Sequence, residues 1–141
     1  MQDAARDDMP EGFYILDPDD SFEMHAGPYY ACDDGDGRSY AFRMARHHAN
    51  AGGAIHGGAL MTFADFAICA EAVRGFPDEA PITVSFSSEF LAAVTNGSLV
   101  TARPEVLRRT GSFVFMRAIL EADGAPALSC TGVIKRFKRK R

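Results

Sequence analysis

The stretch HHANAGGAIHGGALMTFAD, from His47 to Asp65, predicts a glycine-rich loop that runs directly into an apolar helix. The backbone N–H groups at the start of a helix lack intrahelical partners and carry the positive end of the helix dipole. Gly57 and Gly58 allow a ligand to approach these N–H groups closely. The helix carries one carboxylate, Asp65, about two turns from its start. An anion-binding loop beside a carboxylate is suited to attack on an acyl carbonyl.

The helix that follows this loop is expected to form the centre of the core. Nearly all side chains between Gly57 and Arg74 are apolar, and a helix that is apolar all round is normally buried on all sides. Gly75 has the residue type that often follows the last helical turn, and Pro77 prevents the helix from continuing.

The segments on both sides of this helix alternate as strands do. The residues before it predict a short helix and then a hairpin, and those after it predict a series of strands joined by tight turns. Pro104 predicts a bulge or an edge position within its strand. Nothing else in the chain can cover the apolar helix, so we predict an α+β fold in which an antiparallel sheet wraps around one long central helix. The expected strands are 29–32, 40–45, 82–91, 99–107, 113–121 and 127–137.

Length and composition indicate one globular domain. The chain has 141 residues, of which 47% are hydrophobic. Its three cysteines, at positions 32, 69 and 130, are widely spaced and form no C-x-x-C motif, which favours a reducing cytoplasm over a disulfide framework. The four histidines form no metal-ligand pattern either, so we expect no metal and no cofactor.

The two ends of the sequence differ in charge. The net charge is −4, with acidic residues dominant before Asp36 and basic residues dominant after Arg103. We expect residues 1–20 to be a loose lead-in, residues 21–137 to be the domain and residues 138–141 to be a solvated basic tail. The polar start does not read as a signal peptide, and no segment is long and apolar enough to span a membrane. The acidic balance also counts against nucleic-acid binding.

One set of motifs resembles the hotdog-fold acyl-CoA thioesterases, in particular the branch that includes the phenylacetate-pathway thioesterases. The matching residues are Asn50, HGGA at 56–59, Asp65 after Ala64, Thr83, and RTGS at 109–112. The resemblance extends over roughly residues 20–137. It implies a hotdog fold and an enzyme that hydrolyses an acyl-CoA thioester to a carboxylic acid and free coenzyme A.

The resemblance implies a catalytic role for Asp65, as a general base or as a nucleophile that forms a mixed anhydride. It assigns the Gly57 N–H to an oxyanion hole, and Asn50 and Thr83 to positioning the thioester or the attacking water. His56 is expected to support the loop. Each residue also has a structural interpretation: a hydrogen-bonded Asp, a loop-capping Asn, and a Thr favoured by its strand.

A second group of residues is expected to bind coenzyme A. Arg108, Arg109, Thr110, Gly111 and Ser112 form a cationic turn whose backbone N–H groups suit phosphates, although a solvated hairpin explains the same sequence. Gly58 and Phe90 complete this group. The basic tail offers a further cationic rim for the phosphates. Coenzyme A counts here as part of the substrate.

Geometry adds a prediction about assembly. Asp65 lies about 12 Å along the axis from the helix start, at roughly 1.5 Å per residue. That distance is too long for one helix to bring its own N-terminus and Asp65 to the same carbon atom. A second subunit solves the problem by placing its helix N-terminus opposite Asp65. We therefore predict a homodimer, or a dimer of dimers.

Two alternatives to a thioesterase remain open at this stage. A hotdog dehydratase or hydratase would use a His paired with an acid in a different pattern. A non-catalytic acyl-CoA binding or sensing module would not need Asp65. The acyl group itself is not defined, because an aryl or a medium-chain pocket is compatible with the side chains available, namely Met61, Phe63, Phe66, Phe86 and Phe115.

Overall fold

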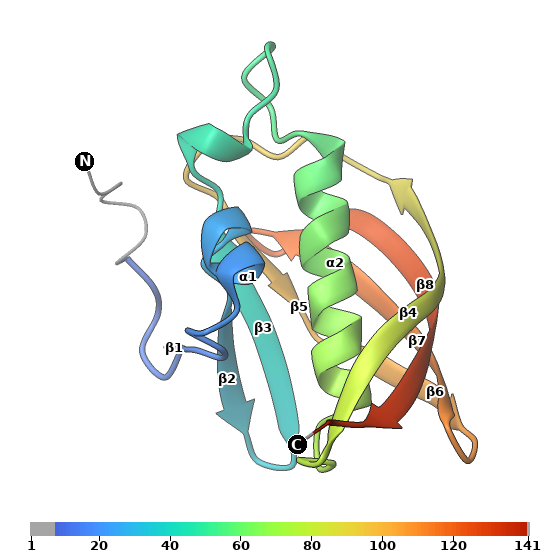
Figure 1. The fold of residues 1–141 in the computed structure, drawn as a ribbon. Helices are drawn as coiled ribbons and strands as arrows, with labels where there is room; N and C mark the ends of the chain where they lie inside the picture. Colours follow the sequence, from blue (N-terminus) through green and yellow to red (C-terminus); the bar gives the residue numbers. More distant parts are fainter. Residues whose placement is uncertain (1–7, 141) are drawn as a thin grey trace.

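One antiparallel sheet curves around helix α2 (Gly57–Ala72) in the computed structural model, which describes residues 8–140 (Figure 1). The strand order is β1-β2-β3-β5-β7-β8-β4, and β6 pairs with β7 beside this path. This architecture confirms the predicted α+β fold. The remaining elements are β1 (Tyr14–Ile15), α1 (Ser21–Ala26), β2 (Tyr30–Asp34), β3 (Gly37–Arg43), η2 (Arg46–His48), β4 (Glu79–Phe90), β5 (Leu99–Ala102), β6 (Glu105–Arg109), β7 (Phe113–Ala122) and β8 (Ala125–Lys138).

Helix α2 packs into the concave face of the sheet. Leu60, Phe63 and Ile68 are almost completely buried there. Strand β8 permits this close approach at Gly132, where an added Cβ would lie 2.5 Å from the Cδ1 atom of Ile68. The expectation that the helix is buried on all sides was wrong for one stripe, because Met61 is 38% exposed and Asp65 is only half-buried.

The strands after α2 follow the predicted pattern with one difference. The segment expected as one strand over 99–107 is divided into β5 and β6 at Arg103 and Pro104. Pro104 has no N–H to donate, so it interrupts the ladder. Strand β5 pairs with β3 and β7, whereas β6 pairs with β7.

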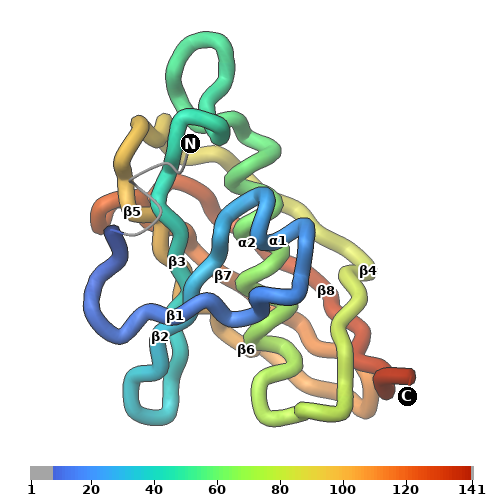
Figure 2. Tube along the Cα trace, turned by 60° about the vertical axis from the view of Figure 1, so that its left-hand side comes forward, coloured from blue at the N-terminus to red at the C-terminus, as the bar shows by residue number. Residues whose placement is uncertain are grey.

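The segment before β2 forms a cover over one side of α2. The side chain of Asp20 accepts a hydrogen bond from the Glu23 N–H at 2.9 Å and so caps α1. Helix α1 lies against α2 in both views (Figures 1 and 2). The expected lead-in contains one short strand, β1, which pairs with β2, and residues 1–7 lie outside the described residues.

None of the helices within residues 8–140 is both long and apolar enough to cross a membrane.

Candidate functional site

Asp65 lines a pocket between α1, α2 and the first half of β4. The pocket has a volume of about 730 Å³, within the usual range for small-molecule sites. The half-buried side of α2 that carries Asp65 and Cys69 forms one part of its lining. Its lining residues are Leu16, Asp17, Asp20, Phe22, Glu23, Tyr29, Thr62, Asp65, Phe66, Cys69, Ala70, Val73, Ala80, Pro81, Ile82, Thr83 and Arg139.

One hydroxyl group and one thiol group contact the Asp65 carboxylate. The Thr83 hydroxyl, on β4, donates to Oδ1 of Asp65 at 2.5 Å. Cys69 lies one helical turn after Asp65, with its Sγ 3.1 Å from the Thr83 hydroxyl and 3.8 Å from Oδ1 of Asp65. Within residues 8–140, no Lys, Arg or His forms an ion pair with Asp65. The carboxylate is therefore oriented but not neutralised.

Cys69 is a poor nucleophile in this setting. Burial, and then the negative charge of Asp65, raise the pKa of the Cys69 thiol to about 12. The thiolate is the reactive form of cysteine, so this thiol stays protonated at neutral pH. Cys69 thus serves the site as a hydrogen-bonding neighbour of Thr83.

The start of α2 presents a backbone donor, as the sequence predicts. His56 is the N-cap residue, and its Nδ1 atom accepts a hydrogen bond from the Gly58 N–H at 2.9 Å. The Gly57 N–H has no hydrogen-bond acceptor among the described residues. The Phe90 ring covers the α-carbon of Gly57, where an added Cβ would lie 2.9 Å from the ring. This leaves one N–H group available to an external acceptor.

His56 acts here through its position. Its Nδ1 atom is used in capping the helix, and its backbone N–H donates to the His48 carbonyl at 2.7 Å. Both contacts fix the loop that precedes α2. This arrangement agrees with a supporting role.

Asn50 lies on an exposed hairpin that projects from the molecule between η2 and α2 (Figure 1). Its Oδ1 atom accepts a hydrogen bond from the Gly52 N–H at 2.9 Å, and its backbone N–H donates to the Ala54 carbonyl at 2.7 Å. The loop-capping interpretation of Asn50 is therefore observed. Asn50 does not line the Asp65 pocket of its own chain.

The cationic turn between β6 and β7 lies at the far end of α2 from Gly57. Arg109 donates to the carbonyl of Ala72, the last residue of α2, at 2.7 Å, and its guanidinium lies 5.2 Å from the centre of the Phe76 ring. Thr110 closes the turn through hydrogen bonds with Phe113. Arg109 and Thr110 therefore have structural roles, and the expected binding of coenzyme A by this turn stays a prediction.

The remainder of the turn is also tied to the sheet. The carbonyls of Gly111 and Ser112 accept hydrogen bonds from Arg136, at 3.4 and 2.7 Å. Arg108 is exposed, and no hydrogen bond or ion pair of its side chain occurs within the described part of the chain. Arg108 is thus the cation of this turn that is available to a ligand.

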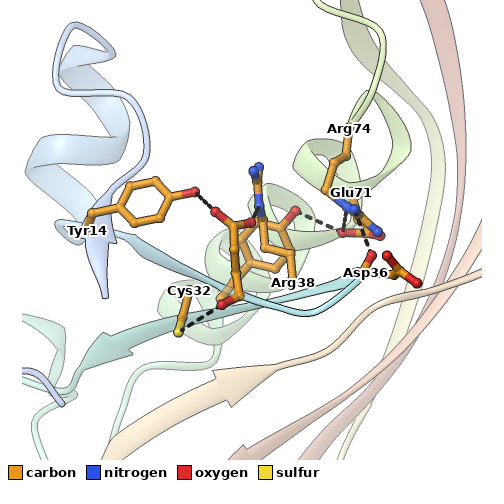
Figure 3. Close-up of polar contacts among 8 residues, drawn as sticks. Tyr14, Cys32, Asp36, Arg38, Glu71 and Arg74 are labelled. Carbon is orange, nitrogen blue, oxygen red and sulfur yellow. Dashed lines mark hydrogen bonds and ion pairs between the residues drawn. The ribbon is translucent and has the colours of Figure 1, made fainter. Parts of the chain in front are cut away.

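A second carboxylate on α2, Glu71, has a very different environment (Figure 3). Arg74 binds it through two nitrogens, with Nη2 2.8 Å from Oε2, and the Tyr40 hydroxyl donates to Oε1 at 3.0 Å. Arg74 also donates to the Asp36 carbonyl at 3.1 Å. Burial, followed by the charge of Glu71, raises the pKa of Tyr40. Glu71 is therefore a structural acid.

The predicted site residues form two groups within one chain. Asp65 and Thr83 meet in the pocket, whereas Gly57, Gly58, His56 and Phe90 meet at the start of α2. About 12 Å of helix separates the two groups, at roughly 1.5 Å per residue.

Most residues that line the pocket, among them Cys69, Glu23 and Tyr29, had no role assigned from the sequence. Cys69 could have been found from its spacing of four residues after Asp65. Glu23 and Tyr29 carry no such signal, because α1 reaches the pocket through tertiary packing. Of the aromatic residues considered for the acyl pocket, Phe66 lines it, Phe63 is buried in the core and Phe115 is exposed on β7.

Comparison with known structures defines the fold as the hotdog fold. A hypothetical thioesterase with coenzyme A from Streptococcus pneumoniae is 19% identical, with 84% of this chain and 93% of that chain aligned and a TM-score of 0.72. A mutant of the phenylacetic acid degradation protein PaaI from Thermus thermophilus is 20% identical, with 84% and 100% aligned and a TM-score of 0.73. A conserved protein from Pseudomonas aeruginosa is 22% identical, with 83% and 94% aligned and a TM-score of 0.75.

The family follows from the sequence profile. Residues 52–126, more than half of the chain, match the Thioesterase superfamily, and the chain therefore belongs to this superfamily. The matched region contains both Asp65 and Gly57. No curated protein matches the chain in sequence.

Proposed function

We propose that this protein is an acyl-CoA thioesterase that uses Asp65 as its catalytic acid–base group or nucleophile. The observation that carries the proposal is a carboxylate without a basic partner in the described chain, oriented by Thr83 at the wall of a pocket of about 730 Å³. The superfamily supplies the reaction class. The coenzyme A that accompanies the Streptococcus pneumoniae relative supports the choice of leaving group.

The reaction is the hydrolysis of a thioester. In the general-base route, Asp65 takes a proton from water while the water oxygen bonds to the carbonyl carbon. The C–S bond then breaks, and the proton passes to the leaving sulfur to give the acid and free coenzyme A. In the alternative route the Asp65 oxygen bonds to the carbonyl carbon, the C–S bond breaks, and the coenzyme A thiolate leaves and takes a proton from water. Water then hydrolyses the resulting mixed anhydride, which gives the carboxylic acid and regenerates the Asp65 carboxylate.

The site is completed by a second copy of the chain. A free Gly57 N–H is suited to the developing oxyanion, but about 12 Å of helix separates it from Asp65 of the same chain. Strand β4 lies at the end of the sheet order, and Ile82, Val84 and Phe90 on it are each more than half exposed. Such an edge favours pairing with a second β4. This supports a homodimer, with a dimer of dimers as its extension.

Coenzyme A is proposed to lie along the turn between β6 and β7. Arg108 supplies an available guanidinium there, and the backbone around Gly111 is exposed. Guanidinium groups bind phosphate oxygens through charge-assisted hydrogen bonds. Asn50 of the projecting hairpin is proposed to position the thioester or water in the partner subunit's site.

The direct test measures thiol release from aryl, short-chain and long-chain acyl-CoA thioesters. We expect turnover by the wild type and its loss in Asp65→Asn. A wild type that binds these thioesters without releasing thiol would instead establish a non-catalytic acyl-CoA binding module.

Subunit complementation tests the composite site. Gly57→Pro removes the N–H, Asp65→Asn removes the acid, and each homodimer is expected to be inactive. A heterodimer holds one intact site, so random mixing should restore about a quarter of wild-type activity. Differently tagged subunits, co-expressed and purified over both tags, provide the heterodimer. No recovery would show that Gly57 and Asp65 do not serve the same thioester across two subunits.

A further inference from the structure

Three carboxylates from the segment around α1 border the same pocket as Asp65. Asp17 and Asp20 lie at the entrance to α1, and Glu23 lies within its first turn. Arg139 is the single basic residue in the lining. The part of the lining that comes from the segment around α1 is therefore acidic, while other lining side chains, such as Phe66 and Val73, are apolar.

Glu23 is the member of this group whose charge acts on pocket residues outside α1. It is half-buried, and its charge acts on Tyr29 and Cys69, both of which are also affected by Asp65. No basic side chain forms an ion pair with Glu23 among residues 8–140. Burial, and then the nearby charges of Asp20 and Asp17, raise the pKa of Glu23 to about 8.

We propose that Glu23 makes this pocket select uncharged acyl groups over acyl groups that end in a carboxylate. The inference deepens the proposed function and rests on it, since it assigns the pocket to the acyl group. An acyl chain attacked beside Asp65 has its far end in the space between α1 and α2. Once Glu23 is ionised, a terminal carboxylate there meets like charge, and this repulsion disfavours it relative to an uncharged end of the same length.

The selectivity is expected to depend on pH. Glu23 is mainly neutral at pH 7 and can donate a hydrogen bond to a polar acyl group. Above pH 8 it is ionised and repels an anion. The groups that face it are Asp17 and Asp20 from its own segment, Tyr29 from the segment after α1, Asp65 and Cys69 from α2, and Arg139 from the segment after β8.

The test compares hexanoyl-CoA with adipoyl-CoA, which have the same chain length and differ by a terminal carboxylate. We expect the ratio of kcat/KM for adipoyl-CoA to that for hexanoyl-CoA to fall about tenfold between pH 7 and pH 9 in the wild type. In Glu23→Gln the same ratio should change less than about twofold. Glu121→Gln is the control, because Glu121 is exposed on β7 outside this pocket.

An equal change of the ratio in the wild type and in Glu23→Gln would overturn the inference. The binding of both thioesters to Asp65→Asn, measured by calorimetry, gives the same ratio without turnover. If the wild type hydrolyses neither thioester, these binding ratios still decide whether Glu23 selects against the anion. The proposed function itself fails only if no thioester of the wider aryl, short-chain and long-chain panel is hydrolysed.

Thermal unfolding provides a readout that is independent of any thioester. A carboxyl group whose pKa is higher in the folded state stabilises the fold least once pH exceeds that pKa. We expect the wild type to lose more stability than Glu23→Gln between pH 5 and pH 9. Parallel curves for the two proteins would contradict the placement of Glu23 in the pocket wall.

Discussion

Asp65 and Glu71 lie six residues apart on one helix, and the chain surrounds them in opposite ways. Glu71 is 7% exposed and is bound by Arg74 and by the Tyr40 hydroxyl (Figure 3). Asp65 is half-buried and receives the Thr83 hydroxyl, with no basic partner among the described residues. The ends of α2 differ in the same sense, because the carbonyl of Ala72 is capped by Arg109 whereas the Gly57 N–H is left free within residues 8–140.

The difference separates stability from function along a single helix. A buried charge with a good partner holds a fold in one arrangement, but the pairing lowers the basicity and nucleophilicity of the carboxylate. A carboxylate that is oriented and left charged keeps its basicity and nucleophilicity. The part of α2 from Gly57 to Asp65 is therefore the part in which substitutions should reduce activity most.

The largest expected effect comes from exchanging the two acids for amides. Asp65→Asn should lower kcat/KM by about a thousandfold or more while changing the free energy of unfolding by less than about 1 kcal/mol. Glu71→Gln should keep activity within a few-fold and lose about 1–3 kcal/mol of stability. Thiol release and urea unfolding, measured on both variants, check that one variant loses mainly activity and the other mainly stability. A similar loss of activity in both would remove the distinction between the two halves.

The second effect concerns the start of the helix. Gly57→Pro removes the free N–H at a position where proline suits a helix, and His56 already has the extended backbone that precedes proline. We expect kcat to fall about 100- to 1000-fold, the usual effect of losing one oxyanion donor.

Gly57→Ala is the matched control, because it adds the same Cβ beside the Phe90 ring but keeps the N–H. The alanine variant should lose much less activity than the proline variant. Equal losses would mean that crowding by Phe90, and not the donor, explains Gly57.

The third effect is on stability and concerns the paired half. Arg74→Met leaves Glu71 buried without its cation, and the free energy of unfolding should fall by about 2–3 kcal/mol. Arg117→Met breaks the exposed pair with Glu105 and should cost at most about 0.5 kcal/mol. Urea unfolding at neutral pH distinguishes the two. Equal losses of stability in Arg74→Met and Arg117→Met would show that the buried ion pair of Glu71 stabilises the fold no more than an exposed ion pair does.

The smallest effect tests how Asp65 is oriented. Thr83→Val keeps the shape of the side chain and removes the hydroxyl that donates to Asp65, so kcat should fall about tenfold at nearly constant KM. Thr83→Ser retains the hydroxyl and should stay within a few-fold of the wild type. A rise in KM alone would assign Thr83 to substrate binding.

Much of this structure is readable in the sequence because it depends on local pattern. The apolar run from Gly57 fixes the central helix, and the alternation in β7, with Val114, Met116 and Leu120 buried, fixes a strand face. The pairing of Asp65 with Thr83 came from a family resemblance, since the two residues are 18 positions apart and meet only in the folded chain.

Other features depend on tertiary packing and have no local signal. Nothing near Glu23 in sequence indicates that α1 lies against α2 beside Asp65. The role of Arg109 in capping α2 depends on a contact across 37 residues. The composition of the cationic turn therefore gave no indication that Arg109 is bound to the end of the helix. Pro104, by contrast, marked its own strand break.

Strand β4 also has a consequence for the life of the newly made chain. It offers an unsatisfied row of backbone donors and acceptors along 12 residues, with exposed Ile82, Val84 and Phe90 beside it. Edges of this kind template the stacking of further strands when their proper partner is scarce. If the proposed dimer forms through this edge, damage to the subunit contact is expected to appear first as insoluble aggregates. In the proposed dimer, pairing with a second copy would thus protect the chain from aggregation in addition to completing the site.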